Sequence, residues 1–356
     1  MHTVFFGTPD FAAIILKKLI DSPYRPFLVV TAPDKPAGRG NQLTPPPVKV
    51  FAQETGIEVV QPEKLNAAFV EELKKAGCEL AIVAAYGLII PQAVLDVPQR
   101  GFINVHGSLL PKYRGASPIQ QAILDGEKET GPTIMLMDAQ IDHGPILSQR
   151  TFPIAPTDTA EDVFAKMAES GGELLLETIP QWTGGDIVPR EQDHKTATYT
   201  ERLAREDGHI NWSKPADHIE RMLRAYTPWP GIFVFFESSL SRKASPNTHP
   251  SAHDLSAVPV DAQRAGKQTA QVDARVESLA GGSKRHGKRL KILALATKGD
   301  EAYEEPGKVI AYEKGFAIQT KKGLVVPTLV HLENKRPQSA EEFLRAYPDI
   351  LTVTLQ

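Results

Sequence analysis

Short apolar runs alternate with longer amphipathic segments along the first half of the chain. The apolar runs predict strands because turn or polar residues bound them, and apolar positions three and four apart predict helices. The predicted strands are residues 3–6, 27–32, 57–60, 80–85, 101–105 and 133–137, and the predicted helices are residues 10–19, 48–54, 67–76, 119–124 and 158–179. This alternation is typical of an α/β fold with a parallel sheet covered by helices on both faces.

The pattern changes after this first domain, which we assign to residues 1–188. A polar, charged stretch at 189–207 predicts a linker, and a second domain follows at 208–356. Short apolar runs separated by Gly and Lys turns predict a small β-barrel in this second domain. After a predicted helix at 217–225, its predicted strands are residues 232–236, 290–296, 307–312, 316–320 and 323–326.

A long segment at about 238–289 interrupts the second domain. It is rich in Ser, Ala, Pro, Gln and Gly, and it contains more Lys and Arg than Asp and Glu. A loop of this length is unusual inside a compact domain, so we expect a flexible insertion. Its basic residues leave two interpretations open, a solvated insertion or an arm that contacts RNA.

Composition narrows the class of protein. The 356 residues are 41% hydrophobic with a net charge of −3, so any contact with nucleic acid must come from local basic patches. The single cysteine, Cys78, excludes an internal disulfide and a multi-cysteine zinc site. The N-terminus does not resemble a signal peptide, and no apolar run has the length of a membrane span. We therefore expect a cytoplasmic protein without a membrane partner.

Candidate catalytic residues lie at the end of the predicted strand 101–105. Asn104 and His106 are two residues apart, so a strand places them on the same face. Downstream, Asp142 lies where a fold could bring its carboxylate beside them. An amide, an imidazole and a carboxylate suit the stabilisation of a tetrahedral oxyanion. Taken alone, the three residues also fit strand-end capping and an ordinary buried histidine, which are common at turns.

A dinucleotide site is not indicated. The first turn contains Gly7 where the dinucleotide motif needs three glycines, and Asp10 would repel a pyrophosphate. The sequence also lacks a phosphate-binding P-loop.

Seven motifs together make the chain resemble the methionyl-tRNA formyltransferases along nearly its whole length, except the insertion. The motifs are residues 6–12, 32–40, 84–91, 106–115, 117–120, 142–144 and 226–230. Asn104, His106 and Asp142 with the Ser-Leu-Leu-Pro run are typical of enzymes that use 10-formyltetrahydrofolate. The loop 33–40 is typical of the tRNA enzyme. The resemblance implies a Rossmann-like formyltransferase domain followed by an oligonucleotide-binding (OB-like) barrel that binds tRNA.

The implied reaction transfers the formyl group of 10-formyltetrahydrofolate to the α-amine of methionyl initiator tRNA, for translation initiation. Asn104 and His106 would donate hydrogen bonds to the oxyanion, and Asp142 would accept from the other ring nitrogen of His106. The reaction needs no metal. Reduced folate and methionyl initiator tRNA are the implied partners, with no obligate protein partner.

Binding residues also follow from the resemblance. Lys35 and Arg39 would contact the acceptor stem of the tRNA, although Asn41 and Gln42 stand where the family often has further lysines. The segments that would line the folate site supply Ala85, Tyr86, Gly87, Leu88, Ile90, Ser108, Leu109, Leu110 and Pro111.

Three alternatives remain at this stage. The acceptor could be an amino-sugar nucleotide, although a small sugar has no need of the loop 33–40. Water could be the acceptor, which would make the protein a formyl-folate hydrolase. The chain could instead be a tRNA-binding protein with an inactive catalytic domain, although Asn104, His106 and Asp142 are all present.

Overall fold

The computed structural model describes residues 1–37, 40–237 and 287–355. The chain divides into two compact units. Unit 1 contains Met1–Ile210 and Asp217–Ile232, and unit 2 contains Asn211–Ala216 and Phe233–Gln356.

A mixed sheet forms the centre of unit 1. Within residues 1–37 and 40–237 its strands, in spatial order, are β11 (Ile146–Gln149), β10 (Thr133–Leu136), β7 (Phe102–His106), β6 (Leu80–Ala84), β1 (Thr3–Gly7), β2 (Leu28–Val30) and β5 (Glu58–Val60). The strands from β7 to β5 are parallel, as predicted. The prediction is wrong for β10, which is antiparallel to β7, and β11, which was not predicted, pairs antiparallel with β10. A short turn joins β10 to β11, and such a turn can only connect antiparallel strands.

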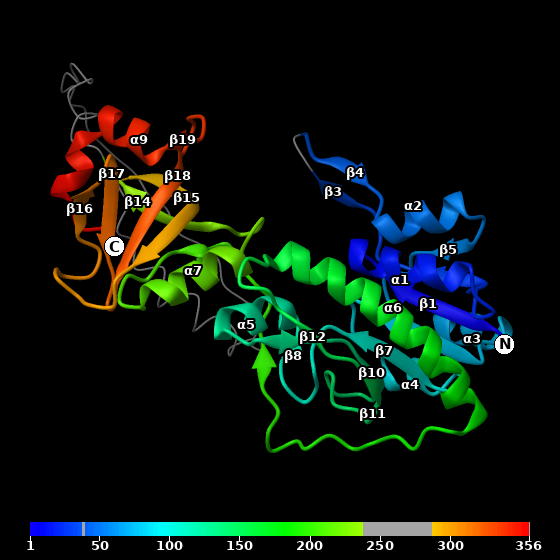
Figure 1. The fold of residues 1–356 in the computed structure, drawn as a ribbon. Helices are drawn as coiled ribbons and strands as arrows, with labels where there is room; N and C mark the ends of the chain where they lie inside the picture. Colours follow the sequence, from blue (N-terminus) through cyan, green and yellow to red (C-terminus); the bar gives the residue numbers. More distant parts are fainter. Residues whose placement is uncertain (38–39, 238–286, 356) are drawn as a thin grey trace, which may run out of the picture. The chain divides into compact units, whose positions relative to one another are not determined.

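Helices cover both faces of this sheet because side chains alternate along each strand. Val4 and Phe6 of β1 belong to a core cluster that also holds Phe69 and Leu73 of α3. On the opposite face α1 packs against α6 (Figure 1). The helices of unit 1 are α1 (Asp10–Ile20), α2 (Pro47–Glu54), α3 (Ala67–Lys75), α4 (Gln92–Leu95), α5 (Pro118–Asp125), α6 (Ala160–Gly184) and α7 (Ala216–Ala225), with a 3₁₀ turn η1 (Glu206–Gly208).

Helix α6 lies close to β7. Thr159 and Asp162 form a capping box at its start, and a left-handed Gly185 ends it. A Cβ at Gly171 would lie 2.8 Å from Cγ1 of Val105, so glycine permits this close contact. The helix thereby supports the strand that carries the catalytic candidates.

Short strand pairs lie outside the main sheet. The hairpin formed by β3 and β4 projects from unit 1 in Figure 1 and was not predicted. These shorter strands are β3 (Lys35–Ala37), β4 (Gln42–Thr44), β8 (Arg114–Gly115), β9 (Glu129–Thr130), β12 (Phe152–Pro153) and β13 (Tyr199–Thr200).

Residues 189–207, predicted to be a linker, belong to unit 1. Arg190 forms an antiparallel bridge with Ile146, and β13 pairs in parallel with β8. Helix α7 also packs on unit 1, because Arg221 donates to the Leu124 carbonyl and Arg224 to the Asp158 carbonyl. These contacts extend unit 1 to Ile232.

Unit 2 contains an antiparallel sheet. Its strands are β14 (Ile232–Phe236), β15 (Lys288–Lys298), β16 (Val309–Tyr312), β17 (Gly315–Gln319), β18 (Leu324–Leu332) and β19 (Gln338–Ser339), followed by α9 (Ala340–Ala346) and the 3₁₀ helix η3 (Pro348–Thr352). Phe316 and Phe343 are buried in its core. Residues 238–286 of the predicted insertion lie outside the described residues, whereas Lys288 and Arg289 begin β15.

Candidate active site

The carboxyl end of β7 carries two of the predicted catalytic side chains. Asn104 is 8% exposed and His106 is 5% exposed. Along the strand, Asn104 lies opposite Val83 of β6 and Met135 of β10, and His106 lies opposite Thr133. Both side chains point to the same face, because both contact the same carboxylate.

That carboxylate belongs to Asp142, in the turn between β10 and β11. Its Oδ1 accepts a hydrogen bond from Nδ2 of Asn104 at 3.4 Å and lies 3.5 Å from Nδ1 of His106. Its Oδ2 accepts the backbone N–H of Gly115 at 2.8 Å. The fold thus brings together the three residues that the sequence separates.

The second ring nitrogen of His106 contacts the protein backbone. Nε2 lies 3.0 Å from the carbonyl oxygen of Tyr113. A carbonyl oxygen only accepts, so Nε2 carries the proton in this arrangement and Nδ1 faces Asp142. A hydrogen bond from His106 to a substrate oxyanion would therefore replace one of these two contacts. The amide of Asn104 already donates, at the long distance of 3.4 Å.

The predicted folate segment after β6 contains two residues with positive φ values. Ala85 and Gly87 have φ values of +44° and +87°. The Tyr86 and Ile90 side chains are buried, and the carbonyl of Tyr86 accepts from the hydroxyl of Thr8 at 2.8 Å. Burial raises the pKa of Tyr86 to about 12.

The exposed large apolar side chains of this segment are those of Leu88, at 40%, and Ile89, at 84%. The sequence interpretation named Ile90 and left out Ile89. Ile89 is nevertheless more exposed than Leu88, and only the burial pattern of the structure reveals this.

The segment from Ser108 to Pro111 is held by its own side chains and by hydrogen bonds between its backbone and the side chains of Thr133 and Gln149. The buried Ser108 hydroxyl donates to the carbonyl of Lys112 at 2.6 Å. Leu110 packs in a small cluster with Met135 and Ile146. Leu109 and Pro111 are half-buried and are the side chains with surface left for a ligand.

The segment formed by residues 190–200 supports this site in a way that the sequence did not indicate. Thr198 accepts the N–H of Tyr113 through its hydroxyl at 2.8 Å, and Tyr113 offers its carbonyl to His106. Gln192 donates to the carbonyls of Asp142 and Gly144. The segment lacks hydrophobic periodicity, so no local signal distinguished these residues from a linker.

The predicted tRNA contacts lie in and beside the β3–β4 hairpin. Lys35 is exposed on β3, and Arg39 lies outside the described residues. Asp34 lies just before the hairpin. Its Oδ1 accepts from Nε2 of Gln61 at 2.7 Å, and both of its carboxylate oxygens accept from Nζ of Lys49 at 2.8–2.9 Å. The Gln61 hydrogen bond and then the Lys49 ammonium hold the pKa of Asp34 below its usual value. This contact anchors the base of the hairpin.

His143 and its neighbours are the His and acidic side chains nearest in sequence to Asp142. His143 bonds Asp138 through Nδ1 at 2.7 Å, and its ring stacks on His194 with centroids 4.0 Å apart. Across the described ranges, the His, Cys, Asp and Glu side chains form no group of three or more that could hold a metal ion. No helix in the part of the chain that the structure describes could cross a membrane.

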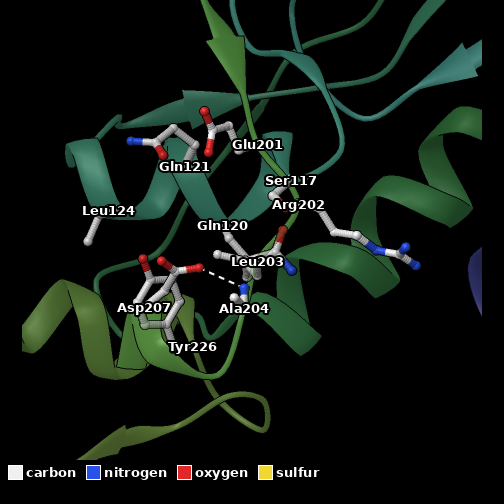
Figure 2. A pocket seen from close by; sticks show the side chains of 10 residues that line it. All are labelled: Ser117, Gln120, Gln121, Leu124, Glu201, Arg202, Leu203, Ala204, Asp207 and Tyr226. Atoms are coloured by element: carbon white, nitrogen blue, oxygen red, sulfur yellow. Dashed lines mark hydrogen bonds between the residues drawn. The ribbon is translucent and has the colours of Figure 1, made fainter. Parts of the chain in front are cut away.

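A separate hollow of about 230 Å³ lies beside α5. Figure 2 shows its lining, which includes Gln120 from α5, Arg202 from the predicted linker and Tyr226 after α7. Asp207 accepts the N–H of Ala204 there at 2.7 Å. Asn104, His106 and Asp142 are not among its lining residues.

Comparison with known proteins gives two matching family models. Residues 1–179 match the family described as formyl transferase. Residues 202–249 and 267–348 match the family described as formyl transferase, C-terminal domain.

Two curated relatives illustrate the similarity. Methionyl-tRNA formyltransferase of Caldanaerobacter subterraneus is 45% identical over 242 residues, which are 67% of this chain and 78% of that protein. Methionyl-tRNA formyltransferase of Geotalea uraniireducens is 36% identical over 349 residues, which are 98% of this chain and 95% of that protein.

A solved structure supports the same fold. An N-formyltransferase of Helicobacter canadensis, in complex with folinic acid and dTDP-3-aminofucose, aligns with a TM-score of 0.57 at 18% identity. The alignment covers 92% of this chain and 99% of that one.

Proposed function

The chain belongs to the methionyl-tRNA formyltransferases, and we propose that Asn104, His106 and Asp142 catalyse its formyl transfer. The observation that carries this proposal is the convergence of two side chains on one oxygen. Nδ2 of Asn104 and Nδ1 of His106 lie 3.4 and 3.5 Å from Oδ1 of Asp142. The site lies at the carboxyl end of a parallel strand, where open α/β sheets bind their ligands.

The chemistry proceeds by addition and elimination. The neutral α-amine of methionine attacks the formyl carbon of 10-formyltetrahydrofolate, and a tetrahedral oxyanion forms. The amide of Asn104 stabilises this oxyanion, and loss of one such donor typically lowers the rate by about 10²–10³. The C–N10 bond of the folate then breaks, and the proton lost by the attacking amine reaches N10. Asp142 and His106 are suited to move that proton, directly or through water.

We place the folate along the edge formed by Ala85 to Ile90 and Ser108 to Pro111. The support is the exposure of Leu88 and Ile89 together with the half-buried Leu109 and Pro111. An apolar surface with a few backbone polar groups is what a pterin ring requires. The buried side chains of Tyr86, Ser108 and Leu110 hold these segments in shape, and the exposed and half-buried apolar side chains are the surface offered to the ligand.

We assign tRNA binding to the β3–β4 hairpin, through Lys35 and Arg39, and to unit 2. The antiparallel sheet of unit 2 supports an OB-like barrel, a fold that binds oligonucleotides on its strands. A reaction that serves translation initiation also fits a cytoplasmic location.

The rival acceptors differ in what they leave behind. An amino-sugar formyltransferase would formylate a sugar nucleotide, a hydrolase would release formate, and an inactive relic would bind tRNA without turnover. The 36% identity to a methionyl-tRNA formyltransferase across 98% of the chain supports the tRNA acceptor.

The test is to incubate the purified protein with 10-formyltetrahydrofolate and methionyl initiator tRNA and to measure formyl-methionine on the tRNA. We expect rapid transfer, with methionyl elongator tRNA and free methionine left unmodified. Release of tetrahydrofolate without formylated tRNA would indicate hydrolysis, and no turnover with retained tRNA binding would indicate a relic. Either result would refute the assignment.

A further inference from the structure

Asp142 has a backbone conformation that needs support from its surroundings. Its φ is +49°, in the left-handed region that side chains other than glycine rarely adopt. Such a residue persists only where neighbouring contacts hold it. The direct contact from Gly115 to Oδ2 holds the carboxylate but leaves the backbone of the turn to be fixed by other groups.

Gln192 supplies that support from the segment 190–200. Its Nε2 donates to the carbonyl of Asp142 at 2.9 Å and to the carbonyl of Gly144 at 2.7 Å. Gln192 is only 5% exposed, so water competes little for these bonds. One amide group therefore ties together the two carbonyls that flank His143.

Arg114 fixes the orientation of the Gln192 amide. Its Nε and Nη2 lie 3.1 and 2.7 Å from Oε1 of Gln192. A guanidinium only donates, so the atom facing it is the amide oxygen and the amide nitrogen must face the turn. Arg114 is 1% exposed, and its other contacts are the hydroxyl of Tyr199 and Nδ1 of His194.

Both residues of strand β8 thus help to hold Asp142, one directly and one through Gln192. Gly115 donates directly to the carboxylate, and the preceding Arg114 acts through Gln192 on the carbonyl. A Cβ at Gly115 would lie 2.3 Å from the carbonyl oxygen of Thr200, so the pairing of β8 with β13 requires glycine. The pairing also keeps the segment 190–200 beside the turn.

We propose that Gln192 and Arg114 are positioning residues for formyl transfer, which hold Asp142 so that Oδ1 faces Asn104 and His106. This inference rests on the proposed roles of those three residues. The contacts of Oδ1 are long, at 3.4 and 3.5 Å, so a further small displacement of the turn would break them. A misplacement of about 1 Å at a reacting group can cost about 10²-fold in rate.

The test uses the full-length variant Gln192→Met, which keeps the length of the side chain and removes both donors. We expect kcat with methionyl initiator tRNA to fall roughly 10- to 100-fold, because the catalytic carboxylate is misplaced. The KM values for tRNA and for 10-formyltetrahydrofolate should stay within about twofold, because Gln192 is only 5% exposed and its amide contacts protein groups. The split between kcat and KM separates positioning from general loss of structure.

Gln319→Met is the matched control. Gln319 of unit 2 is also fully buried, and its Nε2 donates to the carbonyls of Thr320 and Gly323 at 2.9 and 3.1 Å. The control loses the same kind of hydrogen bonds and should lower the melting temperature. At saturating tRNA it should leave kcat unchanged, because an effect of unit 2 on tRNA binding would appear in KM.

Gln192→Glu is a second variant that keeps the acceptor for Arg114 and lacks the donors, so it should lose kcat to a similar extent. The inference would be overturned if kcat were unchanged in both Gln192 variants, or if kcat fell equally in Gln319→Met. It would also be overturned if the Gln192 variants changed only KM, or if neither of them folded. The wild-type protein is measured in parallel. Absence of transfer by wild type would refute the proposed function itself, whereas active wild type with fully active variants would refute only the positioning role.

Discussion

At the residue scale, the catalytic roles proposed for His106 and Asp142 can be tested separately from any role in substrate binding. Both side chains are largely buried, at 6% and 15% exposure, and they contact each other, Asn104 and the backbone of residues 113–115. Their chemical role is therefore distinguishable from a role in holding RNA. The long contacts of Oδ1 also leave room for the site to tighten when substrates bind, as catalytic hydrogen bonds in unliganded sites often do.

We predict that His106→Ala and Asp142→Ala each reduce kcat by at least about 10²–10³ while leaving the Kd for methionyl initiator tRNA unchanged. The rates are measured with saturating 10-formyltetrahydrofolate, and the Kd is measured by filter binding. A parallel loss of tRNA binding would show that these residues serve the structure of the site instead of the reaction.

Burial of Cys78 and Tyr86 in the core makes the stability of the protein depend on pH. Both belong to the cluster packed under α3 and α4. Burial raises the pKa of Cys78 from 9.0 to about 12 and that of Tyr86 from 10.0 to about 12. A folded-state pKa above the unfolded value adds stability that is complete below the unfolded pKa and is lost as pH rises through the folded pKa.

The free energy of unfolding is accordingly expected to decline between about pH 9 and pH 12. Urea denaturation at several pH values measures this decline. Cys78→Ala should make this decline shallower, because one of the two groups is removed. The native thiol should also resist a disulfide reagent at about pH 8 and react once urea unfolds the chain. Rapid reaction of the native thiol would contradict the buried position of Cys78.

The segment 190–200 is the part of the fold that matters most at the scale of elements. Its polar composition predicted a linker, yet it pairs with β8 and β11 and contacts the residues that hold His106 and Asp142. Helices α1, α3 and α5 and the strands of the main sheet other than β11 were predicted close to their observed bounds, because their apolar residues form periodic faces or continuous runs. Strand β11 was not predicted, and α6 continues beyond its predicted end at residue 179. The β3–β4 hairpin was missed because β4 is exposed along its length.

Thr198→Val tests this segment. The substitution removes the acceptor for the N–H of Tyr113, a residue with a φ of +62° whose carbonyl orients His106. We expect a loss of stability of about 0.5–1.5 kcal/mol and a several-fold fall in kcat.

Thr196→Val is the matched control on the same segment, because the hydroxyl of Thr196 contacts only the carbonyl of Asp193 among the hydrogen bonds described for it. Thermal unfolding and steady-state rates are compared for the two variants. Equal rates in both would indicate that Thr198 has no influence on His106.

At the scale of the whole molecule, charge bears on how a protein of net charge −3 binds RNA. Bulk attraction is absent, so local contacts such as Lys35 on the exposed hairpin must supply the phosphate interactions. Contacts of this kind release counterions and are weakened by salt.

We predict that kcat/KM for methionyl initiator tRNA falls with salt, with a logarithmic slope of about −0.7 to −0.9 for each phosphate contacted. The ester of methionine with adenosine, which lacks phosphates, should be formylated at a rate that varies little with salt. Lys35→Ala should reduce the slope by about one. A salt-independent rate with tRNA would remove the electrostatic role of the hairpin.

The sequence by itself determined the alternation of strands and helices, the family resemblance and the placement of Asn104 and His106 on one strand face. These properties are local or periodic, and a strand or helix repeats them over several residues. The tertiary structure alone decided that Asp142 meets both side chains, that β10 and β11 run antiparallel and that Gln192 and Thr198 support the site. Gln192 lies 50 residues from Asp142 along the chain, and a single hydrogen bond over that separation leaves no periodic trace in the sequence.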